Sequence, residues 1–133
     1  MNTIIESTSI INKPHSEVYS FLADLNNHQQ LMPENIYNWS STTDEAQFTI
    51  QNMAKLAIKI SSRIPDQEIV AVPATEAPFA LEMKWEVKDL GNATTEAKHT
   101  IAAELNMMMK MLAAGPLQKL ADQQTAKLKK VLA

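Results

Sequence analysis

The feature that most constrains this chain is a stretch of about seventy residues with the two-residue period of β-strands, followed by a single long helical pattern. Six predicted strands lie near residues 36–42, 45–52, 55–63, 67–74, 80–89 and 94–105. Polar or proline-bearing breaks separate several of them, at Thr43-Asp44, Pro65-Asp66, Ala77-Pro78 and Gly91-Asn92. Strands that follow one another through such short breaks predict an antiparallel meander.

Two of these strands show the alternation most clearly. In 80–89, apolar residues alternate with charged ones, so one face is expected to be buried and the other solvated. The inward residues there are Leu81, Met83, Trp85 and Val87. In 94–105 they are Ala97, His99, Ile101, Ala103 and Leu105. Earlier strands point Phe48, Ile50, Leu56, Ile58 and Ile60 inward.

The segments that flank the meander complete the order. A strand is expected at 3–12, where isoleucine pairs at 4/5 and 10/11 leave the buried face open. A short helix at 14–24 follows, and a second ends before Pro33. After Asn106 the period becomes helical, with an inward stripe of Leu117, Leu120, Ala121, Gln124, Leu128 and Val131. Gly115-Pro116 is expected to kink or break this helix.

This order predicts an α+β helix-grip arrangement in a single domain, residues 1–133. A seven-stranded curved antiparallel sheet would wrap around the long C-terminal helix, with two short helices after the first strand. Since one helix is too narrow to cover one face of such a sheet tightly, we expect a cavity between them.

Composition excludes several classes of function. The chain has no cysteine, only two glycines and a net charge of -3. Thiolate chemistry, phosphate-cradling glycine loops and nucleic-acid binding are therefore not expected. The three histidines lie in different segments without metal-ligand spacing, so we expect neither a metal nor a cofactor. Stable membrane insertion is not expected either. We expect a cytoplasmic protein. The sequence does not indicate an oligomeric state.

The order of elements and both ends of the chain resemble the START-like superfamily, also called SRPBCC. The resemblance lies in the opening INKPHSEVYSFLADLNNHQQLMP (11–33) and in the ending NMMMKMLAAGPLQKLADQQTAKLKKVL (106–132). It covers essentially the full chain, including Pro14, Val18, Phe21, Leu22 and Asp24 of the first helix. The resemblance implies a helix-grip fold around an apolar pocket, which relatives such as polyketide cyclases, birch-pollen-allergen-like and coenzyme Q-binding proteins use for lipids, steroids, polyketides or quinones. It supplies no catalytic residue.

His99 is the histidine that the strand period places on an inward face. Its imidazole could orient a ligand carbonyl or hydroxyl, or act as an acid or base. The alternative is a core histidine bonded to a neighbouring group. Trp85 on the next strand could stack on a flat ligand, or simply fill the core.

Four methionines stand within five positions where the last strand passes into the helix. They could form an adaptable apolar mouth of the cavity, or fill irregular gaps in the core. At least one of Met107, Met108 and Met109 is expected to be exposed or to meet a partner. The predicted ligand-binding set is His99, Trp85, Met83, Phe48, Ile58, Ile101, Met108, Met111, Leu112 and Leu120.

Three functions remain open at this stage. The first is non-catalytic binding of a small hydrophobic molecule, such as a lipid, a quinone or a polyketide-like compound. The second is an enzyme of the polyketide cyclase or dehydratase kind, with His99 as general base and a second polar group beside it. The third is an interaction module that resembles the chaperone activators of the superfamily. For this third function, a filled core and an exposed Met107–Met111 patch would be the distinguishing features.

Overall fold

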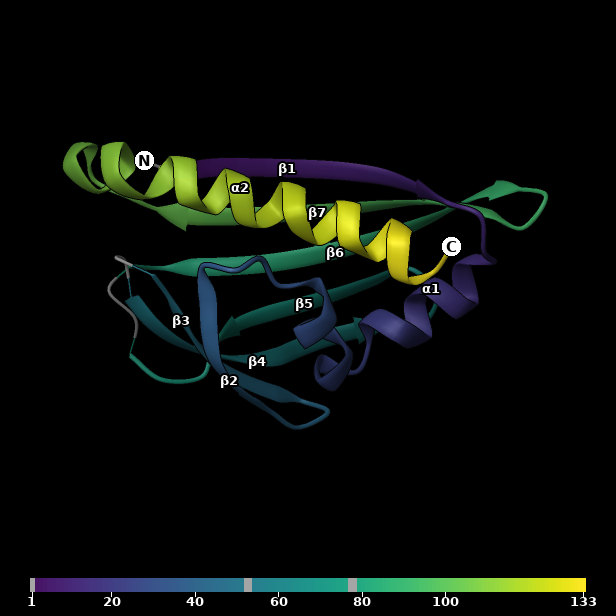
Figure 1. Cartoon of the computed structure of the whole chain (residues 1–133), viewed down its shortest axis with the longest axis horizontal. Helices are drawn as coiled ribbons and strands as arrows, with labels where there is room; N and C mark the ends of the chain where they lie inside the picture. Colours follow the sequence, from purple (N-terminus) through teal and green to yellow (C-terminus); the bar gives the residue numbers. More distant parts are fainter. Residues whose placement is uncertain (1, 52–53, 77–78) are drawn as a thin grey trace.

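The computed structural model describes residues 2–51, 54–76 and 79–133. In these residues a seven-stranded sheet partly encloses a long helix (Figure 1). The elements are β1 (Asn2–Ile11), α1 (His15–Leu22), the 3-10 helix η1 (Leu25–Leu31), β2 (Ile36–Ser41), β3 (Glu45–Ile50), β4 (Ala54–Ile64), β5 (Glu68–Pro73), β6 (Leu81–Gly91), β7 (Thr94–Glu104) and α2 (Met107–Val131). This is the predicted α+β helix-grip fold, with each element within a few residues of its expected place.

The sheet is antiparallel throughout, in the order β1-β7-β6-β5-β4-β3-β2. β7 lies between β1 and β6, and its register pairs His99 with Ser7 on one side and with Trp85 on the other. Inward residues of β6 and β7 alternate with exposed or half-buried ones, as the sequence period predicts. The open question of β1 is settled by Ile5 and Ile11, which are buried, whereas Ile4 and Ile10 face outward.

The residues around α1 and η1 mark where these two short helices begin and where η1 ends. Pro14 stands at the N-cap of α1, where its fixed φ and missing N–H are tolerated, and Glu17 places a negative charge in the first turn. Asp24 caps η1 by accepting a hydrogen bond from the Asn26 N–H at 2.9 Å. Pro33 follows within two residues of its end.

α2 begins at an Asn106 cap, whose side chain accepts from the Met109 N–H at 2.8 Å. The predicted break at Gly115-Pro116 is absent, since the helix runs unbroken from Met107 to Val131. Gly115 has no Cβ, which removes part of the crowding by which a proline ring disfavours helical geometry in the residue before it. Of the predicted inward stripe, Val131 alone is exposed, at the last residue of the helix.

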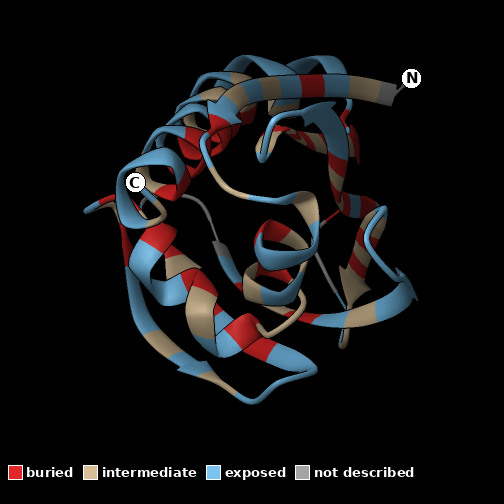
Figure 2. Ribbon diagram, turned by 90° about the vertical axis from the view of Figure 1, so that its right-hand side faces the viewer, coloured by how far each residue is buried: buried red, intermediate tan, exposed pale blue. Residues whose placement is uncertain are grey.

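Buried residues lie on the sheet, on the short helices and on α2 (Figure 2). They form two clusters. The larger cluster contains residues from all seven strands, from η1 and from α2, and includes Phe48 and Leu117. The smaller joins α1 to Trp85, Ala97 and Leu128.

Two details of the prediction lie outside the described residues. These are the expected end of the second meander strand at residue 52 and the break at Ala77-Pro78. Among residues 2–51, 54–76 and 79–133, no helix combines the length and the apolar character needed to cross a bilayer.

Candidate functional site

A small cavity lies where the two core clusters meet, between the sheet, η1 and α2. The volume within which the centre of a water molecule can move is about 20 Å³, which is enough for one water. Its lining is almost wholly apolar and aromatic: Leu25, His28, Met32, Trp39, Phe48, Ile58, Ile69, Ala71, Met83, Trp85, His99, Leu120 and Gln124. Larger hollows belong to the open surface, such as one of about 590 Å³ beside His15 and Lys88.

The wide hollow expected from the sequence is therefore nearly closed. η1 explains the difference, because it lies between the sheet and α2 and places Leu25, His28 and Met32 against the cavity. The expectation of a wide cavity considered only the area that one long helix covers on the sheet. η1 covers part of the same face.

His99 lies in the middle of β7, which pairs with the edge strand β1 on one side and with β6 on the other, and it is 1% exposed. Its ring meets Trp85 edge to face, with ring centroids 4.2 Å apart and planes at 63°. Neither Nδ1 nor Nε2 has a hydrogen-bond partner among the described residues. The sequence alternative of a core histidine bonded to a neighbour is thus not what the structure shows. An N–H directed at the indole would satisfy at most one of the two nitrogens, and only weakly.

Burial, and to a smaller extent nearby His28, lower the pKa of His99 to about 3. The ring is therefore neutral at pH 7, with one nitrogen as donor and the other as acceptor. A base with so low a pKa accepts a proton poorly at neutral pH, so the ring is suited to hydrogen bonding rather than to general-base catalysis.

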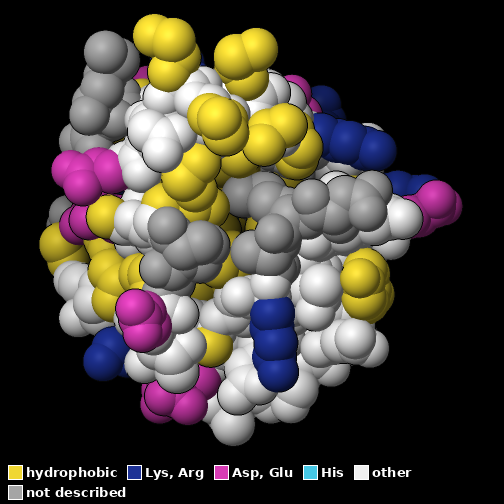
Figure 3. Space-filling view, turned by 90° about the vertical axis from the view of Figure 1, so that its left-hand side faces the viewer, with side chains coloured by type: hydrophobic (Ala, Val, Ile, Leu, Met, Phe, Trp, Pro, Cys, Tyr) yellow, Lys and Arg dark blue, Asp and Glu magenta, His cyan; other side chains and the backbone are white. Residues whose placement is uncertain are grey.

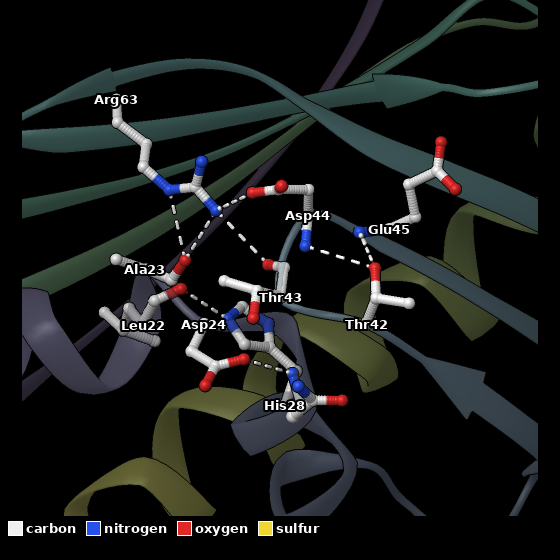
Figure 4. Close-up of polar contacts among 10 residues, drawn as sticks. Leu22, Ala23, Asp24, His28, Thr42, Thr43, Asp44, Glu45 and Arg63 are labelled. Atoms are coloured by element: carbon white, nitrogen blue, oxygen red, sulfur yellow. Dashed lines mark hydrogen bonds and ion pairs between the residues drawn. The ribbon is translucent and has the colours of Figure 1, made fainter.

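His28 is buried on η1, edge-on to Trp85 at 6.4 Å between ring centroids. Its Nε2 hydrogen-bonds to the Leu22 carbonyl at 2.8 Å, which fixes Nε2 as the donor (Figure 4). Burial lowers the pKa of His28, while the bond to Leu22 and the charge of Asp24 oppose that shift. His28 thus donates a hydrogen bond to a nearby backbone carbonyl, whereas His99 has no such partner among the described residues.

Gln124 is the polar residue that α2 contributes to the lining, and it is 3% exposed. Its Nε2 donates to the Met32 sulfur at 3.9 Å, and sulfur is a weak acceptor. Its Oε1 has no partner in the described part of the chain. Of the buried side-chain atoms without a partner in the described residues, His99 Nδ1, His99 Nε2 and Gln124 Oε1 belong to the cavity lining, and we call these three the unpaired polar atoms; Ser9 Oγ and Asn35 Oδ1 lie outside the lining.

Trp39 enters the cavity because β2 is irregular. Asn38 has a positive φ of 56°, and the β2–β3 register shifts between Tyr37 and Ser40. Trp39 then stacks on Phe48, with centroids 5.4 Å apart and planes at 14°. Its indole N–H donates to Ser41 Oγ at 2.9 Å.

Arg63, the single arginine of the sequence, fastens the junction between α1 and η1 to the sheet from outside (Figure 4). Its Nε and Nη2 donate to the Ala23 carbonyl at 3.1 and 2.8 Å. Nη2 also reaches the Thr43 carbonyl at 3.2 Å and Asp44 Oδ1 at 2.7 Å. The wall that carries His28 is thus held by a planar fork of donors on β4.

Six of the ten predicted ligand-binding residues line the cavity: Phe48, Ile58, Met83, Trp85, His99 and Leu120. Ile101 is fully buried in the larger cluster but outside the lining. Met108, Met111 and Leu112 are 72%, 82% and 72% exposed. They do not form a cavity mouth, because they lie on the outward side of the first turns of α2 (Figure 3).

Seven lining residues were absent from that predicted set: Leu25, His28, Met32, Trp39, Ile69, Ala71 and Gln124. The helical stripe did point Gln124 inward. His28 belongs to a 3-10 helix and Met32 is the residue that caps its C-terminus, and the α-helical pattern does not capture the 3-10 period. Trp39 depends on the irregularity of β2, which no residue pattern in this stretch indicates.

No group of three or more His, Asp or Glu side chains in the described residues could hold a metal ion. As far as the described residues show, the lining contains no carboxylate, ammonium or guanidinium group.

No protein-family model and no curated protein matches this chain. Solved structures do match it. A START superfamily protein from Mycobacterium smegmatis is 16% identical at a TM-score of 0.68, over 96% of this chain and 98% of that one. Norcoclaurine synthase from Thalictrum flavum, in complex with dopamine and hydroxybenzaldehyde, is 8% identical at 0.72, over 98% and 86%. Aha1 from Colwellia psychrerythraea, a dimer, is 14% identical at 0.68, over 98% and 96%.

These similarities establish the class of fold. The chain has a START-like, helix-grip fold, as the resemblance in its sequence implied.

Proposed function

We propose that this chain binds a small hydrophobic molecule in the cavity between the sheet and α2, without transforming it. The observation that carries the proposal is the set of unpaired polar atoms beside an apolar cavity. A buried polar atom without a partner costs about 1–3 kcal/mol, so such atoms are uncommon in a core that serves folding alone. An occupant with a matching polar group would recover that cost.

The size of the cavity sets a condition on this function. A space for one water must widen before a larger molecule enters. η1 is the segment we expect to move, because it is a short 3-10 helix whose flanking residues are held from outside by two side chains: Arg63 donates to the Ala23 carbonyl and Lys127 to the Met32 carbonyl. Binding would then select an open form of the same fold.

Both tryptophans of the chain, Trp39 and Trp85, line the cavity. Their fluorescence therefore reports directly on occupancy. We would titrate quinones, fatty acids, sterols and aromatic polyketides, following fluorescence and confirming each complex by native mass spectrometry. Saturable 1:1 binding by one class is the expected result, and an absence of binding by every class refutes the proposal.

A matched pair of variants locates the site. Ala71→Val adds two carbons inside the cavity, whereas Ala46→Val makes the same change at a buried position outside the lining. Binding should weaken in Ala71→Val and persist in Ala46→Val, with circular dichroism showing that both are folded. Equal weakening in both variants would place the ligand elsewhere.

The exposed methionine patch favours a second candidate, a protein-interaction module. We define this patch as Met107, Met108, Met111 and Leu112, each at least 72% exposed. Figure 3 shows hydrophobic side chains gathered at the end of the molecule where α2 begins. Exposed apolar groups at this density are typical of docking surfaces, and methionine adapts to varied partners. The nearly filled interior agrees with this candidate as well.

A second copy of the chain is the partner to test first, since one structural neighbour is described as a dimer. Sedimentation equilibrium should show a concentration-dependent dimer that a Met108→Gln/Met111→Gln variant weakens. Leu90→Gln, a change of another exposed apolar residue, is the control. A monomer at every concentration would reject the second copy.

A further inference from the structure

The hydrogen-bonding capacity of the cavity narrows the class of ligand, provided that the proposed binding function holds. Neutral His99 offers one N–H donor and one nitrogen acceptor. Gln124 Oε1 offers a second acceptor, with no partner in the described residues. The unpaired polar atoms thus require a ligand group that can both accept and donate a hydrogen bond.

Charged ligands fit this cavity poorly. The lining holds no residue of opposite charge to pair with a carboxylate or an ammonium group. Moving an unpaired ion into such surroundings is far more costly than burying a neutral polar group. Fatty acids in their ionised form are therefore disfavoured.

Acceptor-only ligands fit incompletely. A quinone or ketone oxygen could take the His99 N–H, but the two acceptors of the site would stay unsatisfied. A hydroxyl group satisfies more of the set, since it can accept from His99 and donate to Gln124 Oε1. The aromatic walls, Trp39 stacked on Phe48 and Trp85 against His99, suit a flat body attached to that hydroxyl.

We propose that the ligand is an uncharged phenol or similar flat alcohol whose hydroxyl bridges His99 and Gln124. In its absence one water can occupy the same place, because the free volume of about 20 Å³ is enough for it. The recognised feature is then the hydroxyl, and the apolar body contributes buried area.

Probes of matched size distinguish between hydrocarbon, hydroxyl, quinone and carboxylate ligands. We would measure dissociation constants by calorimetry for toluene, p-cresol and p-toluate, and for naphthalene, 2-naphthol, 1,4-naphthoquinone and 2-naphthoate. The hydroxyl compound of each size should bind about tenfold or more tighter than the parent hydrocarbon, a factor that corresponds to about 1.4 kcal/mol. The carboxylates should be the weakest.

Variants assign the preference to the two residues. In Gln124→Met or His99→Leu the hydroxyl compound should lose its advantage, while the hydrocarbon binds as before or better. Gln123→Met is the control, since Gln123 is exposed one position earlier on α2. Preference retained in both cavity variants overturns the assignment of the hydroxyl to these residues.

The outcomes distinguish this inference from the function on which it rests. If hydrocarbon and hydroxyl compound bind equally, or a carboxylate or quinone binds tightest, the inference is wrong and ligand binding stands. If no probe of either size binds, and the wider panel fails too, both are wrong.

Discussion

The burial of neutral His99 makes the stability of this protein depend on pH in a defined direction. The pKa of His99 falls from an ordinary value of 6.5 to about 3 in the folded state. Between these two pKa values, His99 is therefore protonated in the unfolded chain and neutral in the folded protein. The stabilisation is fully present above pH 6.5 and is lost as the pH falls from there toward 3. His28 acts in the same direction, because its pKa is lowered too.

The magnitude follows from the two pKa values. At pH 5 the unfolded-state His99 is almost fully protonated, whereas the folded state is not. The free energy of unfolding is then lower than at pH 7 by about 2 kcal/mol from this residue alone. Since pH 5 lies well above the folded-state pKa, the result depends little on how low that pKa is.

The assay compares the wild type with His99→Leu. Urea unfolding at pH 7 and pH 5, followed by circular dichroism, gives the loss of stability for each protein. The wild type should lose about 2 kcal/mol more than the variant between these pH values. Equal losses in the two proteins would refute the burial of a neutral, unpaired His99, and with it the basis of the proposed site.

Three other substitutions test contacts that hold the fold around the site, each by chemical unfolding. Arg63→Lys keeps the charge but loses the fork to Ala23 and Thr43, so stability should fall by about 1 kcal/mol and acrylamide should quench Trp85 more strongly; unchanged quenching would contradict a fastening role. Gly91→Ala should cost about 1–2 kcal/mol, because φ is +86° while nothing lies within 4 Å; no loss would mean the turn relaxes. Asn106→Ala should cost about 1 kcal/mol by removing the cap of α2; a neutral result would show that the cap is not needed.

The fold could be predicted because its strands have one buried and one solvated face. Met83 and Trp85 alternate with charged residues on β6, and this pattern fixes both the strand and its facing. β1 shows the limit of the method. Its paired isoleucines fit either face, and the tertiary pairing with β7 decides that Ile5 is the buried one.

The site was predicted less completely, for reasons that the missed residues make clear. Periodicity places a side chain on a face, and it located His99 and Leu120 on the walls of the cavity. It does not show how far a helix extends past the sheet, so Met108 and Met111 were assigned to a mouth that they do not form. Irregular backbone is also invisible to it, and Trp39 and His28 both depend on such segments.

The interior of this protein contains apolar residues that stabilise the fold and polar residues that do not. Folding requires only that the sheet and α2 bury apolar surface, which Phe48, Ile101 and Leu117 do without help from polar groups. His99 and Gln124 work against that demand, since each holds a polar atom that finds no partner in the described residues. Both lie on regular elements and both line one cavity, so loose packing does not explain them. Departures from the rules of core packing that gather at one place are expected at functional sites. The polar atoms are thus better explained by an occupant than by the fold.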